Sequence, residues 1–349
     1  MSGPRFDAKS SLPARVVALL LCWLPPWRQR RGGVCQKVLI VRPDRRVGNQ
    51  VITSALVLGM AKERPDIELH YLAPEGRDDL LRGLPGLHAV HVLPRHPIKN
   101  LGAFFSLIRR LRAERFDCAI DASHWHSFSL TAAVLTRLSG APMTVGHARP
   151  GAAGLVGQWI PVPHQGHWPA ELEVKLSLLE PLGVRGVKPR TALPEKGGAD
   201  EAMVWWAAHA TRSGRVLLWP TTRKSSTEIP AGLWPSVLCA LPLPESCSIG
   251  VGWGPGEASL AEQLVRALEG EGFEAAALPE TSIAELAQFM RQADVVVSGD
   301  TGPMHVAGAC DVSVFGVFRQ DDGRRWLPRG ANNRGFNLSN RGEIVEFEQ

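Results

Sequence analysis

The sequence Val295-Val-Val-Ser-Gly-Asp-Thr-Gly-Pro-Met-His305, which continues into Val-Ala-Gly-Ala-Cys310, predicts a strand, a tight turn and the start of a helix in one short span. Thr301 is a favourable N-cap residue, and Pro303 suits the first helical turn. Helix N-termini present unpaired backbone N–H groups and a partial positive charge, so this turn is a candidate phosphate site. His305 follows Thr301 by one helical turn and is expected to face the same ligand. The alternative is an ordinary capped turn between a strand and a helix.

Short apolar runs alternate with segments of helical spacing along most of the chain. Strands are expected at 37–41, 67–72, 88–93, 116–121, 215–220, 248–252, 275–278 and 295–298, and helices at 49–62, 101–112, 258–268 and 283–292. Alternation of this kind indicates an α/β fold with parallel sheets. Ligands of such sheets bind at the carboxyl ends of the strands, so the turns that follow the strands are where the chemistry is expected.

The length of 349 residues is enough for two domains of ordinary size. Residues 186–200 are rich in Pro, Gly and charge, which is typical of an interdomain linker. We therefore expect a basic and apolar N-terminal segment (1–35), two Rossmann-like domains (36–185 and 201–325) on either side of the linker, and a weakly patterned C-terminal tail (326–349).

Positive charge is concentrated at the N-terminus. Residues 1–46 hold ten Lys or Arg and two acids, a net of +8, so the rest of the chain is near −3 when the whole chain is +5. That distribution argues against a nucleic-acid-binding body. An apolar run at 14–27 followed by a basic cluster at 28–31 is too short to span a bilayer, and the order of its parts disfavours a signal peptide. Contact with an anionic membrane surface through residues 14–31 and an extra packing segment both remain open.

Six cysteines show no metal-ligand spacing, and a reducing cytoplasm is expected. No Walker A motif and no nucleophile-elbow motif is present, which disfavours P-loop phosphoryl transfer and α/β-hydrolase chemistry.

Two further turns in the second half carry candidate ligands. Gly252-Trp-Gly-Pro-Gly-Glu257 departs from the dinucleotide fingerprint because its last residue is Glu, whose carboxylate suits a ribose diol or simply a first helical turn. Thr221, Thr222, Arg223 and Lys224 combine hydroxyls with cations, as a pyrophosphate site requires. A solvated polar loop is the alternative for that run.

Polar turns also follow two strands of the first half. Asp44-Arg-Arg-Val-Gly-Asn49 contains Gly48 for a tight turn and Asn49 at an expected N-cap. Asp121 and His124 lie at the carboxyl end of the strand at 116–121, where they are candidate polar contacts to an acceptor molecule. Two histidines at His124 and His126 without a third spaced ligand are a weak metal motif, and we expect no essential metal ion.

Together these turns resemble glycosyltransferase family 9, the ADP-heptose:lipopolysaccharide heptosyltransferases and their relatives, over about residues 36–320. Asp300-Thr-Gly-Pro-Met-His305 is similar to the family's D-[ST]-G-x-x-H-[LV]-A block, which binds the donor diphosphate in relatives. Gly254-Pro-Gly-Glu257 resembles the family's Gly-Pro-x-Glu turn, whose acid contacts the donor ribose. Thr281-Ser-Ile-Ala-Glu-Leu resembles a segment that lines the nucleobase pocket, and Thr221–Arg223 resembles a phosphate-contacting loop.

The resemblance implies a GT-B fold, in which two Rossmann-like domains face each other. It also implies inverting transfer of a sugar, heptose being favoured, from a nucleoside-diphosphate sugar to a lipopolysaccharide or other surface-glycan acceptor, without a cofactor. The enzyme would be cytoplasmic or peripheral on the inner face of the inner membrane. The donor residues carried over are Thr221, Thr222, Arg223, Lys224, Glu257, Thr281, Asp300, Thr301, Gly302 and His305.

The first turn departs from the family pattern. Gly48-Asn49 stands where the family has Gly-Asp, and that Asp is the family's general base; Thr53 is retained, and Gly48, Thr53 and His124 fall on the acceptor side. An amide cannot accept a proton at neutral pH, so Asn49 cannot do that work.

Three interpretations of this departure remain open. Asp44 or Asp121 takes the proton, or Asn49 orients the acceptor while a substrate group or water takes it. In the third, the chain is a weak or inactive transferase, which makes it a nucleotide-sugar-binding protein of the same fold. The family also has a lysine three residues before a proline in the loop of the second domain. In this chain Thr227 stands three residues before Pro230, and Lys224 is the candidate to replace that lysine. A Rossmann oxidoreductase is disfavoured because no dinucleotide fingerprint is present.

Overall fold

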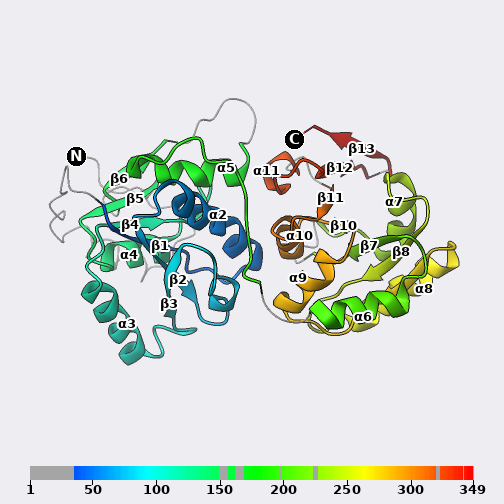
Figure 1. Cartoon of the computed structure of the whole chain (residues 1–349), viewed down its shortest axis with the longest axis horizontal. Coiled ribbons are helices and arrows are strands. Elements are labelled where there is room, and N and C mark those ends of the chain that lie inside the picture. The colour runs from blue at the N-terminus through cyan, green and yellow to red at the C-terminus, as the bar shows by residue number, and fades with distance from the viewer. Residues whose placement is uncertain are drawn as a thin grey trace. The chain divides into compact units, whose positions relative to one another are not determined.

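Each half of the chain forms its own sheet, with helices packed around it (Figure 1). The computed structural model describes residues 35–148, 156–161, 169–195, 199–222, 227–319, 323–340 and 342–348. The chain divides into an N-terminal unit, Met1–Pro189, and a C-terminal unit, Arg190–Gln349. Among the described residues, no helix combines the length and the apolar character needed to cross a bilayer. The segment 14–31, expected at a membrane surface, lies outside the described residues.

The sheet of the N-terminal unit has six parallel strands in the order β3-β2-β1-β4-β5-β6. They are β1 (Lys37–Val41), β2 (Glu68–Pro74), β3 (Leu87–Leu93), β4 (Cys118–Asp121), β5 (Met143–His147) and β6 (Gln158–Ile160). The connecting helices are α2 (Val47–Glu63), α3 (Leu101–Ala113), α4 (Leu130–Leu138) and α5 (Glu171–Leu176). Residues 38–41 of β1 are fully buried, as expected for a central parallel strand covered on both faces.

This strand order creates a switch point between β1 and β4. The chain runs outward from β1 to β2 and β3, then returns to place β4 on the other side of β1, with Val41 in register with Asp121. Open α/β sheets bind ligands at such a point, beyond the carboxyl ends of the two strands. The loops after Val41 and Asp121 therefore meet where a ligand is expected.

The C-terminal unit repeats the arrangement in a seven-stranded sheet ordered β13-β12-β11-β10-β7-β8-β9. Its strands are β7 (Gly214–Trp219), β8 (Cys247–Val251), β9 (Glu274–Ala277), β10 (Val295–Ser298), β11 (Ser313–Phe318), β12 (Arg334–Leu338) and β13 (Ile344–Phe347), of which only β13 is antiparallel among the described strands. Its helices are α6 (Ala199–His209), α7 (Trp234–Ala240), α8 (Ala258–Gly270), α9 (Ile283–Arg291), α10 (Gly302–Gly308) and α11 (Gly323–Trp326). The switch point lies between β7 and β10, where Trp219 is in register with Ser298.

Two features differ from the sequence-based expectations. Helix α2 begins at Val47 with Arg46 at the N-cap, so the prediction of Asn49 as N-cap is wrong: the amide of Gln50 already bonds to the carbonyl of Arg46 at 3.2 Å. The segment 326–349, expected as a tail, contributes β12 and β13 to the sheet. Its short strands alternate with polar residues, which hid them in the sequence.

Candidate active site

In the C-terminal unit, the loops after four adjacent strands meet at the carboxyl edge of the sheet. Glu257, at the N-cap of α8, accepts hydrogen bonds on Oε2 from the Thr221 hydroxyl at 2.8 Å and from the Gly254 amide at 2.9 Å. These bonds join the loop after β7 to the loop after β8. Two of the residues predicted to bind a donor, Thr221 and Glu257, are therefore in direct contact.

Glycines allow these loops to approach closely. A methyl group at Gly252 would lie 2.6 Å from the ring of Trp219, which ends β7 and is buried. A methyl group at Gly299 would lie 3.0 Å from the side chain of Thr222. The close approach brings Thr222 beside the turn that contains Asp300, so a third loop joins the cluster.

The turn after β10 follows the predicted course. Strand β10 ends at Ser298, Thr301 occupies the N-cap position of α10, and Pro303 lies in the first turn, all as predicted. The Thr301 hydroxyl makes no cap bond to the helix among the described residues. Asp300, Thr301 and Gly302 are partly exposed.

His305 follows in the same helix, on a more enclosed side. It is buried one turn into α10, and its ring centroid lies 6.4 Å from that of Trp326 in α11.

The loop after β9 completes this edge. Thr281 directly precedes Ser282, which caps α9 together with Glu285 in a capping box. Trp253 donates from its indole nitrogen to the Leu278 carbonyl at 2.7 Å, which ties the β8 loop to the β9 loop. Arg223 and Lys224 lie outside the described residues.

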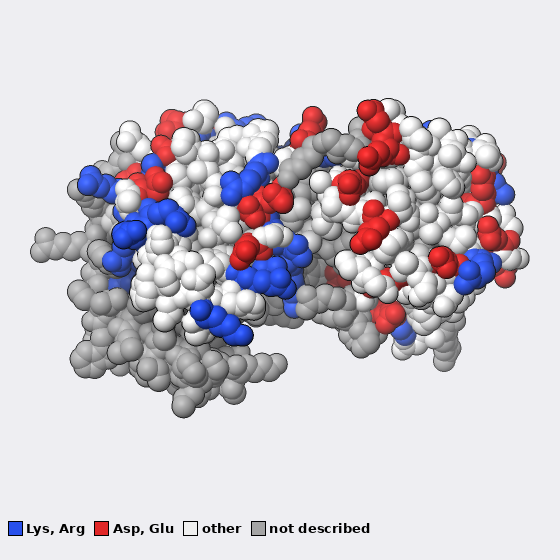
Figure 2. All heavy atoms as spheres, turned by 90° about the horizontal axis from the view of Figure 1, so that it is seen from below, with Lys and Arg blue, Asp and Glu red and all other residues white. Residues whose placement is uncertain are grey.

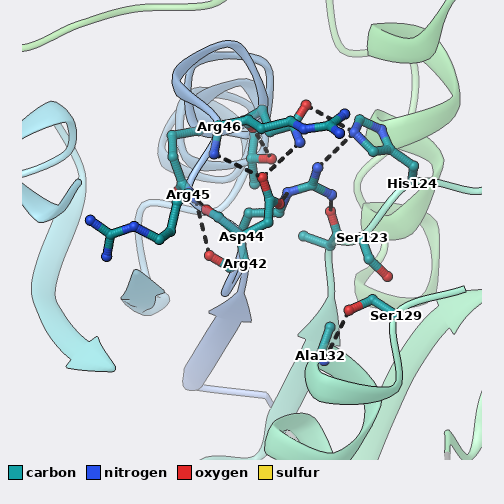
Figure 3. A network of polar contacts seen from close by, with 12 residues as sticks. Arg42, Asp44, Arg45, Arg46, Ser123, His124, Ser129 and Ala132 are labelled. Atoms are coloured by element: carbon teal, nitrogen blue, oxygen red, sulfur yellow. Dashed lines mark hydrogen bonds and ion pairs between the residues drawn. The ribbon is translucent and has the colours of Figure 1, made fainter. Parts of the chain in front are cut away.

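In the N-terminal unit, a ring of four side chains occupies the switch point (Figure 3). Arg42, the first residue after β1, extends its guanidinium between Asp44 and His124. Its Nε lies 2.5 Å from Oδ2 of Asp44, and its Nη2 lies 2.7 Å from Nε2 of His124. Asn49 closes the ring, with Nδ2 donating to Oδ1 of Asp44 at 2.7 Å and Oδ1 lying 2.9 Å from Nε2 of His124.

The ring rests on buried supports. The Arg42 side chain is only 1% exposed, and its Nη1 donates to the Ala122 carbonyl at 2.6 Å. Lys175, from α5, donates to the same carbonyl at 2.8 Å. Gln50 donates to the carbonyls of Arg42 and Asp44, and it accepts the Tyr71 hydroxyl. These bonds fix the loop after β1.

Glu171 anchors His124 from outside the ring. Its Oε1 contacts Nδ1 of His124 in a short hydrogen bond, and its Oε2 lies 3.6 Å from Nδ1 of His126. The Glu171 side chain is 2% exposed, whereas that of His124 is 11% exposed and that of Asp44 is 37% exposed. The histidine is therefore held by Glu171 on Nδ1, while Nε2 faces the ring of Arg42, Asp44 and Asn49.

Burial and charge set the protonation states. Burial, with Arg42 adding to it, holds the pKa of His124 well below its usual value. Burial alone would raise the pKa of Glu171, but hydrogen bonds from His124 and His126 hold it well below its usual range. Burial and the nearby Arg42 lower the pKa of Lys175 to about 7. Near neutral pH, Glu171 is thus a carboxylate and His124 a neutral imidazole.

Three of the predicted site residues are buried, at positions where they support the surrounding structure. Asp121 is fully buried, and its Oδ1 accepts the amide and hydroxyl of Ser123 at 2.9 and 2.5 Å. Thr53 is fully buried and donates to the Asn49 carbonyl at 2.7 Å, so its hydroxyl supports the helix. Gly48 is buried in the first turn of α2.

Sequence reasoning missed Arg42, Glu171 and Lys175. Glu171 and Lys175 lie four residues apart in α5, a spacing that reads as a solvent-exposed ion pair, yet both are buried. Of the three, only Arg42 could have been identified from the sequence, because it is a charged residue directly after a buried strand.

His124, His126 and Glu171 also lie close enough together to hold a metal ion. Arg42 and Lys175 flank this group, and their positive charge opposes a divalent cation there.

A second histidine group lies at the amino ends of the strands, away from this edge. It comprises His70, His88 and His91 with Glu68 and Glu114. The ammonium of Lys37 lies 2.7 Å from Glu68 and 2.9 Å from Glu114, so a cation already sits between the two carboxylates.

Comparison with known proteins shows the family that the chain resembles. The model of glycosyltransferase family 9, the heptosyltransferases, matches residues 104–349. Lipopolysaccharide heptosyltransferase 3 of Escherichia coli is 23% identical over 295 residues, which cover 82% of this chain and 84% of that protein.

Solved structures agree with the match. Glycosyl transferase family 9 from Veillonella parvula superposes with a TM-score of 0.70 at 15% identity, over 88% of this chain and 86% of its own. E. coli heptosyltransferase WaaC with ADP-2-deoxy-2-fluoro heptose gives a TM-score of 0.65 at 21% identity, over 86% and 92%. E. coli ADP-heptose lps heptosyltransferase II gives 0.66 at 17%, over 86% and 90%. The similarities confirm the predicted GT-B fold, with two Rossmann-like units built on parallel sheets.

Proposed function

This chain belongs to glycosyltransferase family 9, and we propose that it transfers heptose from ADP-heptose to a lipopolysaccharide or related surface-glycan acceptor, with inversion at the anomeric carbon. The observation that carries the proposal is the cluster of donor residues at the carboxyl edge of the C-terminal sheet, where Glu257, Thr221 and the start of α10 lie on adjacent loops. The choice of donor and acceptor follows the relatives: WaaC was solved with an ADP-heptose analogue and with ADP, and the curated relative acts on lipopolysaccharide.

Each loop has a role in holding the donor. The Glu257 carboxylate, fixed by Thr221, binds the ribose hydroxyls, and Thr281 lies beside the nucleobase. The diphosphate binds at the start of α10, between Thr301 and Gly302, because the N–H groups and dipole there favour negative charge. Thr222, Asp300 and His305 complete the phosphate site, and the next two residues in the sequence, Arg223 and Lys224, are cations.

The reaction needs two things beyond donor binding. The acceptor hydroxyl attacks the anomeric carbon as the nucleoside diphosphate leaves, and groups preorganised around the diphosphate stabilise the charge that develops on it. The acceptor's proton must also be removed. The ring at the switch point of the N-terminal unit is where the acceptor's hydroxyl binds, with Asn49 and Asp44 as the polar groups that orient it.

The chain also carries features suited to a membrane surface. Ile98, Leu101 and Phe105 are exposed apolar side chains in the first turns of α3 and in the loop before it, and six exposed basic residues belong to the same segment, 95–115. These are Arg95, Lys99, Arg109, Arg110, Arg112 and Arg115. Lys and Arg are also the more frequent charges on the N-terminal unit in the view of Figure 2. Apolar and basic groups together favour an anionic bilayer surface, so we include peripheral contact through this face and residues 14–31 in the proposal.

Asn49 favours a second candidate, a protein of this fold that binds a nucleotide sugar without turning it over. Binding of ADP-heptose without transfer to any lipopolysaccharide acceptor would support that reading.

The proposed function is tested by Thr301→Val and His305→Ala. Each is expected to weaken ADP-heptose binding, measured by titration calorimetry, about tenfold, which corresponds to about 1.4 kcal/mol. Ser313→Ala, at the opposite edge of the same sheet, is the matched control and should bind normally. Unchanged binding and transfer in both site variants would contradict the assignment of this edge.

A further inference from the structure

We propose that His124, held by Glu171, is the general base of this enzyme and accepts the acceptor's proton in place of the aspartate that is missing at residue 49. The inference rests on the proposed transfer reaction and adds to it the identity of the proton acceptor. It is carried by the arrangement of three polar groups that contact the imidazole, Glu171, Arg42 and Asn49.

The inner nitrogen of the imidazole fixes its tautomer. Nδ1 of His124 contacts the buried carboxylate of Glu171, which can only accept a hydrogen bond. Nδ1 must therefore carry a proton, and in the neutral ring the lone pair lies on Nε2. A carboxylate behind a histidine in this way also stabilises the imidazolium that forms when Nε2 takes a proton.

The outer nitrogen has a partner for each protonation state. Nε2 lies 2.7 Å from Nη2 of Arg42, which can only donate, and 2.9 Å from Oδ1 of Asn49, which can only accept. The neutral ring accepts from Arg42, and the protonated ring donates to Asn49. A base that gains and loses a proton in each catalytic cycle needs a hydrogen-bond donor for its neutral state and an acceptor for its protonated state.

The balance of charge favours His124 over the acids nearby. Asp44 neutralises Arg42, so protonating Asp44 would leave a guanidinium that is 1% exposed without its counterion. Asp121 is fully buried. Protonating His124 creates a cation beside Glu171. The imidazolium is then paired with Glu171, and the Arg42 guanidinium remains paired with Asp44. Lys175 and Arg42 oppose the new charge, while Glu171 and, more distantly, the polar His126 face it from the other side.

The amide of Asn49 suits a histidine base better than a carboxylate would. A carboxylate at this position would stabilise the imidazolium and raise the pKa of His124, which lowers the fraction of neutral imidazole that can act as a base. The amide leaves the ring neutral and still offers an acceptor for the proton that arrives.

His124 takes the proton of the acceptor as the glycosidic bond forms. The hydroxyl of the acceptor displaces the Arg42 hydrogen bond at Nε2 and gives its proton to that nitrogen. Its oxygen forms a bond to the anomeric carbon while the bond from that carbon to the diphosphate oxygen breaks, and the electron pair leaves with the nucleoside diphosphate. The imidazolium, bonded to Glu171 and Asn49, then releases its proton to water.

The first experiment measures transfer kinetics of the full chain with ADP-heptose and lipopolysaccharide truncated in its inner core. His124→Asn and His124→Gln should lower kcat about 10²–10⁴-fold, the usual contribution of a base, and leave the KM for the donor unchanged. His88→Asn, an exposed histidine of the second histidine group, is the control and should stay within about threefold of the unmodified chain. A kcat for both His124 variants like that of the unmodified chain, or an equal loss in His88→Asn, would overturn the proposal.

The pH profile separates a base from a packing role. Glu171→Gln should lower kcat at least about tenfold and move the acid limb of the kcat profile to lower pH, because the imidazolium loses its counterion. An unmoved limb would mean that Glu171 only supports the fold. If Asp44→Asn abolishes the acid limb and the His124 variants keep it, Asp44 is the base and the proposal fails.

A measurement that needs no activity keeps the two proposals apart. Nitrogen-15 NMR of the imidazoles in the full chain should show His124 neutral at pH 7, with its proton on Nδ1, and Glu171→Gln should change that signal. The opposite tautomer, or a protonated ring at pH 7, would overturn the role of His124 even if transfer is observed. Failure to transfer heptose with the expected tautomer intact would instead count against the proposed function.

Discussion

Nε2 of His124 lies 2.9 Å from Oδ1 of Asn49, so the residue at the position where the sequence resemblance implies a general base is in contact with a different candidate base. This contact predicts the effect of Asn49→Asp. A carboxylate there stabilises the imidazolium, so the acid limb of the kcat profile should move to higher pH and kcat at pH 7 should fall. Asn49→Ser, which is neutral, should leave the limb in place. A higher kcat at every pH in Asn49→Asp would mean that residue 49 still needs its own carboxylate.

The bond between Glu257 and Thr221 predicts a loss of nucleotide affinity in Glu257→Gln. The amide retains the size of the side chain but loses the charge that draws hydrogen bonds from Thr221 and Gly254. Binding of ADP should weaken about tenfold in titration calorimetry, or about 1.4 kcal/mol. Glu262→Gln, on the exposed side of α8, is the control. Equal affinities for the two variants would show that the charge of Glu257 does not reach the ligand.

The close approach at Gly252 predicts a loss of stability in Gly252→Ala. The new methyl group would lie 2.6 Å from the buried ring of Trp219, and overpacking of this kind costs about 1–3 kcal/mol. Gly270→Ala is the matched control, since nothing lies within 4 Å of its new methyl group. Denaturant unfolding should separate the two, and an unchanged midpoint for Gly252→Ala would show that the Trp219 ring can move aside.

The histidine group at the amino ends of the strands predicts a stability that depends on pH. Burial, with His70 contributing, lowers the pKa of His91 to about 4. The unfolded chain, with the usual histidine pKa of about 6.5, therefore binds a proton more readily between these values, and stability should fall as pH decreases through that window. The slope contributed is up to about 1.4 kcal/mol per pH unit. His91→Gln should flatten the curve of unfolding free energy against pH, whereas His209→Gln, on exposed α6, should not.

The exposed apolar residues of the α3 face predict binding to anionic vesicles. In the triple variant Ile98→Ser, Leu101→Ser, Phe105→Ser, three apolar side chains that would insert into the bilayer surface are replaced by polar ones. The fraction of the full chain that floats with phosphatidylglycerol vesicles should therefore fall at least about tenfold. Met203→Ser with Val204→Ser, exposed on α6, is the control. Equal flotation of the triple variant and the control would assign any membrane contact elsewhere.

The sequence predicted the fold better than it predicted the site. Buried parallel strands are continuous apolar runs, so the strand at 295–298 and the turn into α10 could be placed to the residue. The donor residues follow one strand after another, and a family pattern joined them.

The N-terminal ring resisted prediction because it depends on which strands are neighbours. Arg42 and His124 are 82 residues apart in sequence, and only the pairing of β1 with β4 brings them together. Glu171 belongs to a short helix whose charged residues look solvent-exposed, and burial of such a residue leaves no mark on sequence periodicity. The histidine pair was visible in the sequence, but its carboxylate partner was not.

The closed ring of Arg42, Asp44, Asn49 and His124 also bears on how such a sequence arises. Each member contacts two others, so the effect of changing one depends on the identity of the rest, and the free energies of paired substitutions should not add. If His124 is the base, aspartate at residue 49 can be exchanged for asparagine without loss of transfer only in a chain that already has histidine at residue 124. A relative with asparagine at the first position but no histidine at the second is then expected to bind its donor and transfer nothing.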